Sequence, residues 1–214
     1  MTNAVDRKVG ISAEMTPEVT NTETGVSVRY IQNPNRQWFV FRVTYGREQK
    51  ASLLIEQQGI EVYLPMRPIY KMLNGKRIRK MESLMPNLLF VHCTKDEADA
   101  LVKRTPELST FLRYYYNHLQ FTPEGKNPPL IIQDSSMLNF IRTVNTANEH
   151  LKVVNSKNCH YKSGEKVRVI MGCFAGVEGK VARVAGQQRV IVEIDGLCAI
   201  ATAYIPSAFL ERIK

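Results

Sequence analysis

The sequence is poor in cysteine and lacks any long apolar run. It contains four cysteines, and none of them forms a CxxC pair or has a histidine at metal-ligand spacing. Sparse cysteines with mostly apolar neighbours fit buried small side chains in a reducing cytoplasm better than a disulfide framework. No stretch approaches the roughly 18–20 apolar residues that cross a bilayer. The N-terminal segment carries acidic side chains and no apolar core, so we expect a cytoplasmic protein without a signal peptide or membrane contact.

The sequence also lacks a recognisable catalytic or metal-binding constellation. Its four histidines are scattered, with no HExxH or comparable pair, and it has neither a P-loop nor a GxGxxG pattern. Cys173 follows a glycine and is better explained as a buried turn residue than as a nucleophile. We therefore expect a protein that is not an enzyme and that needs no cofactor and no metal.

Positive charge is what the sequence has in excess. The formal net charge is +9, and residues 36–146 hold sixteen basic and ten acidic side chains while residues 152–214 hold ten and five. Such a field favours polyanionic partners, namely DNA, RNA or the acidic surface of a nucleic-acid machine. Charge alone leaves open a basic protein without such a partner.

The pattern along residues 36–146 predicts an α+β sandwich in which helices cover a sheet. Residues 1–35 show no sustained period and are predicted to be a mostly disordered extension. Strands are expected at 38–44, 61–70, 76–84, 88–91 and 111–116, and helices at 47–58 and 95–104, followed by a last helix that Asp134 or Ser135 caps. Asn74-Gly75 is a hairpin signal inside a basic tip. Thr94 and Glu97 have the spacing of a capping box.

Residues 161–214 change character after a predicted linker at 147–160. Short β-branched strands alternate with glycine turns, a pattern typical of a small all-β barrel. Val167–Ile170 and Val190–Ile194 are strongly strand-prone, so we expect a constitutive barrel without a helical alternative.

Three stretches resemble the NusG family of transcription factors. Trp38–Val40 followed by Tyr45–Glu48 resembles the opening strand and helix of the family's N-terminal (NGN) domain. Pro86–Val91, after a basic hairpin, is similar to the family's Phe-Pro-(Gly/Asn)-Tyr-(Val/Leu)-(Leu/Phe)-Val motif. Residues 164–181 resemble a KOW motif, in which glycines shape an SH3-like barrel. Met85 and Leu88 depart from the family, which usually carries Phe and Tyr there.

The resemblance implies a monomeric elongation factor that binds the clamp of the largest RNA polymerase subunit and suppresses pausing and termination. The implied polymerase contacts are Phe41, Arg42, Met85, Leu88 and Phe90, for which plain sheet core is the alternative. The resemblance also implies contact with non-template DNA or nascent RNA. The candidates for that contact are Thr44, Tyr45, Arg47, Lys50, Lys76 and Arg77, for which a solvated charge cluster is the alternative.

The barrel is implied to recruit Rho or a ribosomal protein. Its motif residues are Gly164, Gly172, Phe174, Gly176 and Gly179. Phe174 is either an exposed partner contact or a core residue at the barrel mouth.

Residues 186–190, 202–210 and 111–115, together with the polar extension, resemble UpxY-type paralogues that act on capsular polysaccharide operons. A housekeeping NusG that acts genome-wide stays open as an alternative. A stand-alone KOW-type RNA-binding module, with Tyr114, Tyr115 and Tyr116 stacking on bases, stays open as well.

Overall fold

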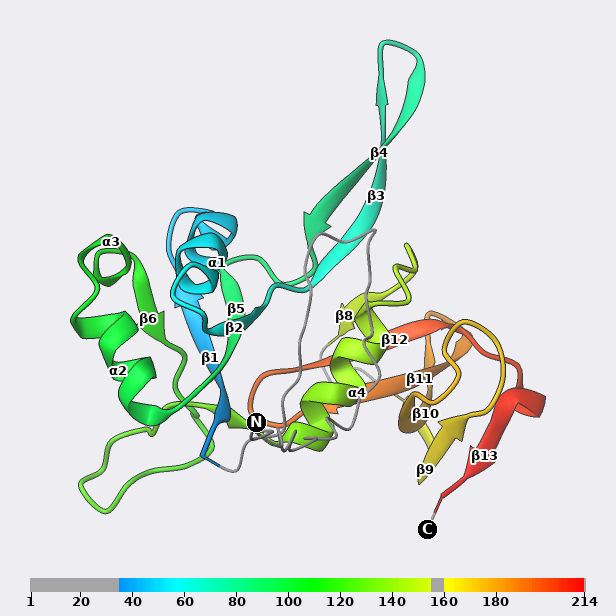
Figure 1. Cartoon of the computed structure of the whole chain (residues 1–214). Helices are drawn as coiled ribbons and strands as arrows, with labels where there is room; N and C mark the ends of the chain where they lie inside the picture. Colours follow the sequence, from blue (N-terminus) through cyan, green and yellow to red (C-terminus); the bar gives the residue numbers. More distant parts are fainter. Residues whose placement is uncertain (1–34, 155–159, 214) are drawn as a thin grey trace, which may run out of the picture.

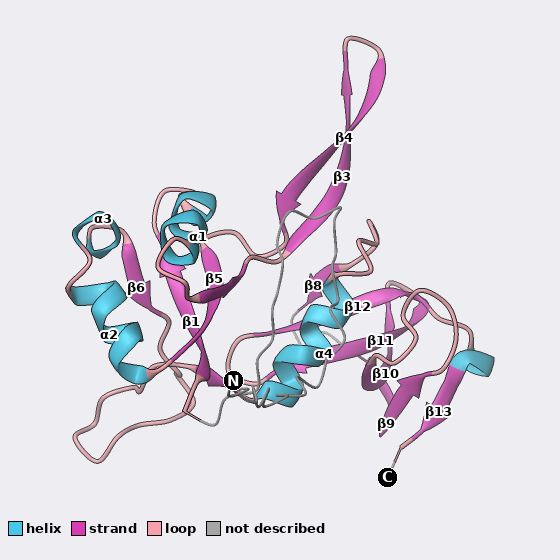
Figure 2. Ribbon diagram, viewed as in Figure 1, coloured by secondary structure: helices cyan, strands magenta, loops and turns pink. Residues whose placement is uncertain are grey.

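The computed structural model describes residues 35–154 and 160–213, which form two parts (Figure 1). A mixed α/β part comes first and a β-rich part follows it, so the expected fold class is confirmed for both. Helix α4 (Asp134–Val144) lies between the sheet of the first part and the strands of the second (Figure 2). The extension predicted for residues 1–35 lies outside the described residues except for Asn35.

Strand β1 is the centre of the first sheet. It pairs antiparallel with β5 on one side and with β6 and β7 on the other, while β2 pairs with β5. The bounds are β1 Gln37–Val43, β2 Glu61–Tyr63, β5 Leu88–Cys93, β6 Leu112–Tyr114 and β7 Ile131–Ile132. Side chains on both faces of β1 are buried, which explains why the run from Trp38 to Phe41 is continuously apolar.

The two faces of this sheet are covered differently. Phe39 and Phe41 belong to a buried cluster with α1 (Glu48–Glu56), α2 (Lys95–Lys103) and α3 (Pro106–Ser109). Trp38 and Val40 point the other way, because successive side chains of a strand alternate. They join a second cluster that runs through α4 into the β-rich part.

The helix starts test the predicted caps. At the start of α2, the Thr94 hydroxyl accepts a hydrogen bond from the Glu97 N–H, and the Glu97 carboxylate accepts one from the Thr94 N–H, so the capping box is confirmed. The N-cap of α4 is Gln133, which makes no side-chain cap bond. Asp134 or Ser135 as the cap was therefore wrong. Asp134 instead lies in the first turn, where its charge suits the helix dipole.

Strands β3 (Met66–Leu73) and β4 (Lys76–Ser83) form a two-stranded arm that projects from the molecule (Figure 1). Asn74 and Gly75 have φ of 50° and 75°, the positive values that a two-residue turn of this kind requires. The predicted hairpin is confirmed. The single strand predicted at 61–70 is divided into β2 and β3 by Leu64 and Pro65, because proline has no N–H for the ladder.

The β-rich part, which we call the barrel below, is one curved sheet in the order β13-β9-β10-β11-β12-β8. The bounds are β8 Lys152–Val154, β9 His160–Val169, β10 Glu178–Val184, β11 Gln187–Ile194, β12 Cys198–Tyr204 and β13 Leu210–Arg212, with a 3-10 turn at Ser207–Phe209. A Cβ at Gly179 would collide with the Ile191 carbonyl of the neighbouring strand. This position therefore needs glycine for close strand approach.

The predicted linker is partly structured. Within it, β8 pairs with β12, so residues 152–154 form an edge strand of the barrel sheet. Leu151, just before β8, is fully buried. The remaining linker residues 155–159 lie outside the described part. In the described ranges, no helix is long and apolar enough to span a bilayer.

Candidate nucleic-acid and protein interface

The turn after β1 displays an aromatic side chain in an unusual backbone conformation. Tyr45 is 86% exposed and has φ of 63°. A left-handed conformation is costly for a residue with a Cβ and calls for local support. Asn87 supplies that support, because its carbonyl accepts the Val43 N–H at 2.8 Å and its side chain accepts the Gly46 N–H at 3.4 Å. The carboxylate of Glu48 in turn accepts the Asn87 N–H.

Cations surround this turn. The Arg47 guanidinium lies 5.6 Å from the Tyr45 ring and 5.3 Å from the Phe111 ring, and the Lys50 ammonium lies 6.0 Å from Phe111. Thr44 is bound to the Phe111 carbonyl through its N–H at 3.1 Å. The structure thus brings Thr44, Tyr45, Arg47 and Lys50 together as one exposed aromatic-cationic surface, which we call the Tyr45 loop. Such a surface can stack on a base and neutralise phosphates.

The implied polymerase contacts divide into one exposed residue and four buried or half-buried ones. Arg42 is exposed on β1. Phe41 and Phe90 are fully buried, Met85 is 6% exposed, and Leu88 is half-buried against the cluster shared with the barrel. Met85 Sδ lies 3.9 Å from Sγ of Cys198 on the barrel strand β12. In this arrangement the barrel covers part of the implied polymerase surface.

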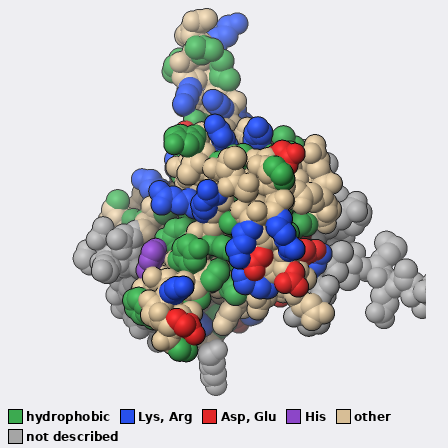
Figure 3. Space-filling view, turned by 90° about the vertical axis from the view of Figure 1, so that its left-hand side faces the viewer, with side chains coloured by type: hydrophobic (Ala, Val, Ile, Leu, Met, Phe, Trp, Pro, Cys, Tyr) green, Lys and Arg blue, Asp and Glu red, His purple; other side chains and the backbone are tan. Residues whose placement is uncertain are grey.

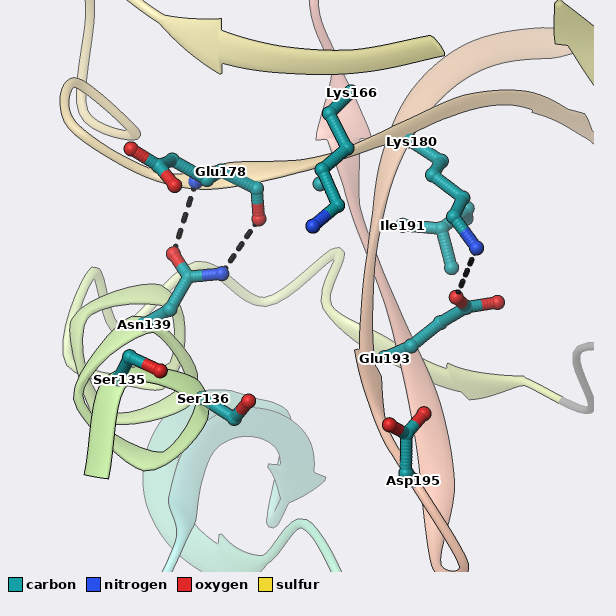
Figure 4. A pocket seen from close by; sticks show the side chains of 10 residues that line it. Ser135, Ser136, Asn139, Lys166, Glu178, Lys180, Ile191, Glu193 and Asp195 are labelled. Carbon is teal, nitrogen blue, oxygen red and sulfur yellow. Dashed lines mark hydrogen bonds and ion pairs between the residues drawn. The ribbon is translucent and has the colours of Figure 1, made fainter. Parts of the chain in front are cut away.

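Helix α4 is joined to the barrel by specific hydrogen bonds. The Asn139 side chain donates to the Glu178 carbonyl at 2.6 Å and accepts from the Glu178 N–H at 2.9 Å (Figure 4). Arg142, one helical turn further, donates to the Gly176 carbonyl at 2.8 Å. Beside these bonds lies a polar cavity of about 380 Å³ between α4 and strands β9–β11. Lys180 and Glu193 form a 2.8 Å ion pair on its barrel wall.

The segment before β8 is held from both sides. Arg67 of the arm donates to the Leu151 carbonyl at 3.3 Å, and Arg189 of β11 donates to the His150 carbonyl at 3.1 Å. Arg189 is itself buried and also donates to the Thr202 carbonyl at 2.6 Å. Two arginines, one from each part, therefore bind neighbouring carbonyls of the connecting segment.

In the barrel, Phe174 is 4% exposed and belongs to the shared cluster, so the core alternative holds. Gly172 and Gly176 have φ of 82°, as turn residues, and Gly164 lies within β9. Ile170 and Met171 beside this turn are 49% and 54% exposed.

The candidate stacking triplet after α3 is mostly internal. Tyr114 is buried, Tyr115 packs against the shared cluster, and Tyr116 is 45% exposed. One exposed ring offers little for stacking on successive bases.

The described residues contain no group of three or more metal-ligating side chains. Burial raises the pKa of the Cys93 and Cys198 thiols to about 12. Both stay protonated at neutral pH, which is the opposite of an activated nucleophile. Cys173 is exposed, contrary to the buried position expected for it.

The interdomain contacts were not found from the sequence. Asn139 and Arg142 have the three-residue spacing of one polar helix face, but this spacing does not reveal what the face contacts. Arg67 and Arg189 lie in strands among many other cations, and nothing in the pattern singles them out.

These features define a protein that joins a helix-covered sheet to a β-rich part and carries exposed basic surfaces suited to polyanions. Residues 36–141 match the family model described as "Transcription termination factor nusG". The "Transcription termination/antitermination protein NusG" of Lactococcus lactis subsp. lactis (strain IL1403) is 26% identical over 161 residues, covering 71% of this chain and 80% of that protein. A solved structure described as "Domain interaction in Thermotoga maritima NusG" covers 84% of this chain and 98% of its own, with 20% identity and a TM-score of 0.41.

Residues 36–141 are therefore similar to the NusG family, whose model and relative are both described as transcription termination or antitermination proteins.

Proposed function

We propose that this chain is a cytoplasmic, non-enzymatic elongation factor that binds the RNA polymerase clamp and suppresses pausing and termination. The observation that carries the proposal is the Tyr45 loop, an exposed ring beside two cations on the domain that matches the family. A factor that binds the active elongation state more tightly than the paused state shifts the balance by that difference in affinity.

The Tyr45 loop is proposed to contact the non-template strand or the nascent RNA. A photo-crosslinking residue at position 45, in a reconstituted paused complex, tests this contact. We expect crosslinks to the non-template strand that vanish when Arg47 and Lys50 are changed to Gln. Crosslinks to neither nucleic acid would refute the contact.

Polymerase binding is proposed to use Arg42 together with the apolar surface around Met85 and Leu88. Because the barrel covers part of that surface, contact through it requires the barrel to move away. Arg42→Glu is the cleaner test, since Arg42 is exposed and its change leaves the core intact. We expect loss of retention on core polymerase, whereas Arg104→Glu, an exposed charge at the end of α2, serves as the matched control. Equal retention of both variants would contradict the assignment.

For the barrel we propose a protein partner, either Rho or a ribosomal protein. The exposed Ile170 and Met171 next to the buried Phe174 support a contact at this turn. Met171→Asp should abolish capture of that partner by the full chain without changing retention of polymerase. Retention of RNA without any polymerase binding would instead favour the stand-alone RNA-binding module.

We propose further that the factor is specialised for a surface polysaccharide operon. The support is the likeness of residues 186–190 and 202–210 to UpxY-type paralogues. Nascent-transcript sequencing after gene deletion separates this role from a housekeeping one. Loss of distal reads in one operon is expected, and shifts across hundreds of genes would favour the housekeeping factor.

A further inference from the structure

The projecting arm concentrates the positive charge of the molecule. Residues 66–83 hold six basic side chains and one acidic one, a net +5 out of +9 for the whole chain. All residues from 71 to 80 are exposed. Figure 3 shows Lys and Arg side chains along the arm, with apolar side chains between them. The arm therefore presents more than half of the net charge on a thin ribbon.

The register of the arm distributes these cations over both of its faces. Directly paired residues lie on the same face of a two-stranded ribbon. The pairs Lys71↔Ile78, Leu73↔Lys76 and Ile69↔Lys80 therefore place three lysines on one face. The pairs Met72↔Arg77 and Tyr70↔Arg79 place two arginines on the other. We call these the lysine face and the arginine face.

The cations are available for an external partner. Within the described residues, Lys71, Lys76, Arg79 and Lys80 make no ion pair or side-chain hydrogen bond. Arg77 has only a long contact with Glu149, at 3.7 Å and largely exposed, so it contributes little binding energy there. Its guanidinium lies 4.0 Å above the Tyr70 ring, which holds it in place on the arginine face.

We propose that the arm binds double-stranded DNA by entering the major groove tip first, with its two faces against the two phosphate backbones. A ribbon with side chains on both faces is about 10 Å thick, by analogy with the spacing of packed sheets. This thickness fits the roughly 12 Å major groove of B-DNA and exceeds the roughly 6 Å minor groove. The proposal deepens the proposed function by naming duplex DNA as the partner of the arm. Binding of the arm to DNA stands on the geometry alone, and only its role during transcription rests on the proposed function.

The same geometry separates duplex DNA from other anions. The major groove of an RNA duplex is too narrow to admit side chains, so duplex RNA offers the ribbon no entry. A single strand binds by stacking on aromatic rings in a groove, and the arm carries one exposed aromatic ring, Tyr70. An anionic membrane would also attract the charge, but it would not require cations on opposite faces.

The test is binding of the full-length chain to four fluorescent probes in a salt titration. The probes are a short DNA duplex, one of its strands alone, the RNA duplex of the same sequence, and vesicles of anionic phospholipid. The variant carries Lys71→Gln, Lys76→Gln and Lys80→Gln, which empty the lysine face. The matched control carries Lys103→Gln, Lys126→Gln and Lys166→Gln, three exposed lysines outside the arm and the segment that it contacts.

We expect the DNA duplex to bind best, and the arm variant to lose roughly tenfold in affinity with a salt slope lower by about 3. The control triple should retain most of the affinity. Equal losses in both triples, an unchanged arm variant, or tighter binding to RNA duplex, single strand or vesicles would overturn the proposal. Retention of core polymerase is measured in parallel on the same proteins. Wild-type protein that binds duplex DNA but not polymerase would sink the proposed function while leaving the arm proposal standing.

Discussion

The two faces of the first sheet are closed in different ways. On the face of Phe41, the covering helices α1, α2 and α3 lie in the same part of the chain as the sheet and complete a core within that part. On the face of Trp38, α4 is itself covered by the barrel, so the core is shared between domains. The first core forms whenever the domain folds. The second is complete only while the domains are in contact, which makes the packing of that face dependent on domain arrangement.

The largest expected effect comes from breaking the first core. Phe41 is fully buried and stacks on Tyr114 at a centroid distance of 5.2 Å. Phe41→Ala should lower the free energy of unfolding by about 3–5 kcal/mol, since it removes a large buried ring and leaves a cavity. Urea unfolding monitored by circular dichroism measures this. The contacts between α4 and the barrel should persist below the transition, and their loss there would show that the two cores are not separable.

A smaller effect is expected from releasing the shared core. Asn139→Ala removes both hydrogen bonds to the Glu178 backbone and leaves that donor and acceptor to find water. The domain contact should weaken by about 1–3 kcal/mol, with little change in the unfolding of either domain. Amide chemical shifts of β10 and α4 report the contact. Ser135→Ala is the control, because Ser135 lines the same cavity without a side-chain bond among the described residues; an equal response to both changes would remove Asn139 from this role.

The sequence predicted each domain better than the contact between them. Asn74-Gly75 and the Thr94–Glu97 capping box were predictable because their signals are local, set by backbone φ and by a fixed spacing. Tyr45 was a candidate only through the family resemblance, and the structure places its ring at the surface. The burial of Met85 by the barrel could not be predicted, because it depends on Cys198, which is more than a hundred residues away in the chain.

The shared core also predicts a dependence on pH. Burial raises the pKa of Cys198 from an ordinary 9.0 to about 12, so the closed arrangement favours the protonated thiol. The domain contact should therefore be at full strength below pH 9 and weaken as the pH rises from 9 toward 12. Thiol labelling followed by peptide mass spectrometry measures how accessible Cys198 becomes when the contact weakens. Among the described cysteines, Cys173 should react before Cys198 and Cys93. Asn139→Ala should accelerate the labelling of Cys198 but not that of Cys93, which is buried in the first core; acceleration of both would indicate global loosening instead of domain release.

The smallest expected change in stability is at the Tyr45 loop, because its ring lies at the surface and belongs to neither buried core. Tyr45 makes few contacts that hold it, yet its φ of 63° is one that asparagine tolerates better than tyrosine. Tyr45→Asn should therefore leave the unfolding free energy within about 1 kcal/mol of the parent or raise it slightly, because any lost contact with Arg47 is exposed. The same change should abolish a stacking contact with a base. Thermal unfolding and pause lifetimes on one template, measured side by side, test the pair of effects. A stable variant with unchanged pausing would mean that the ring is displayed without being used, and a strongly destabilised one would mean that Tyr45 supports the turn and not a nucleic-acid contact.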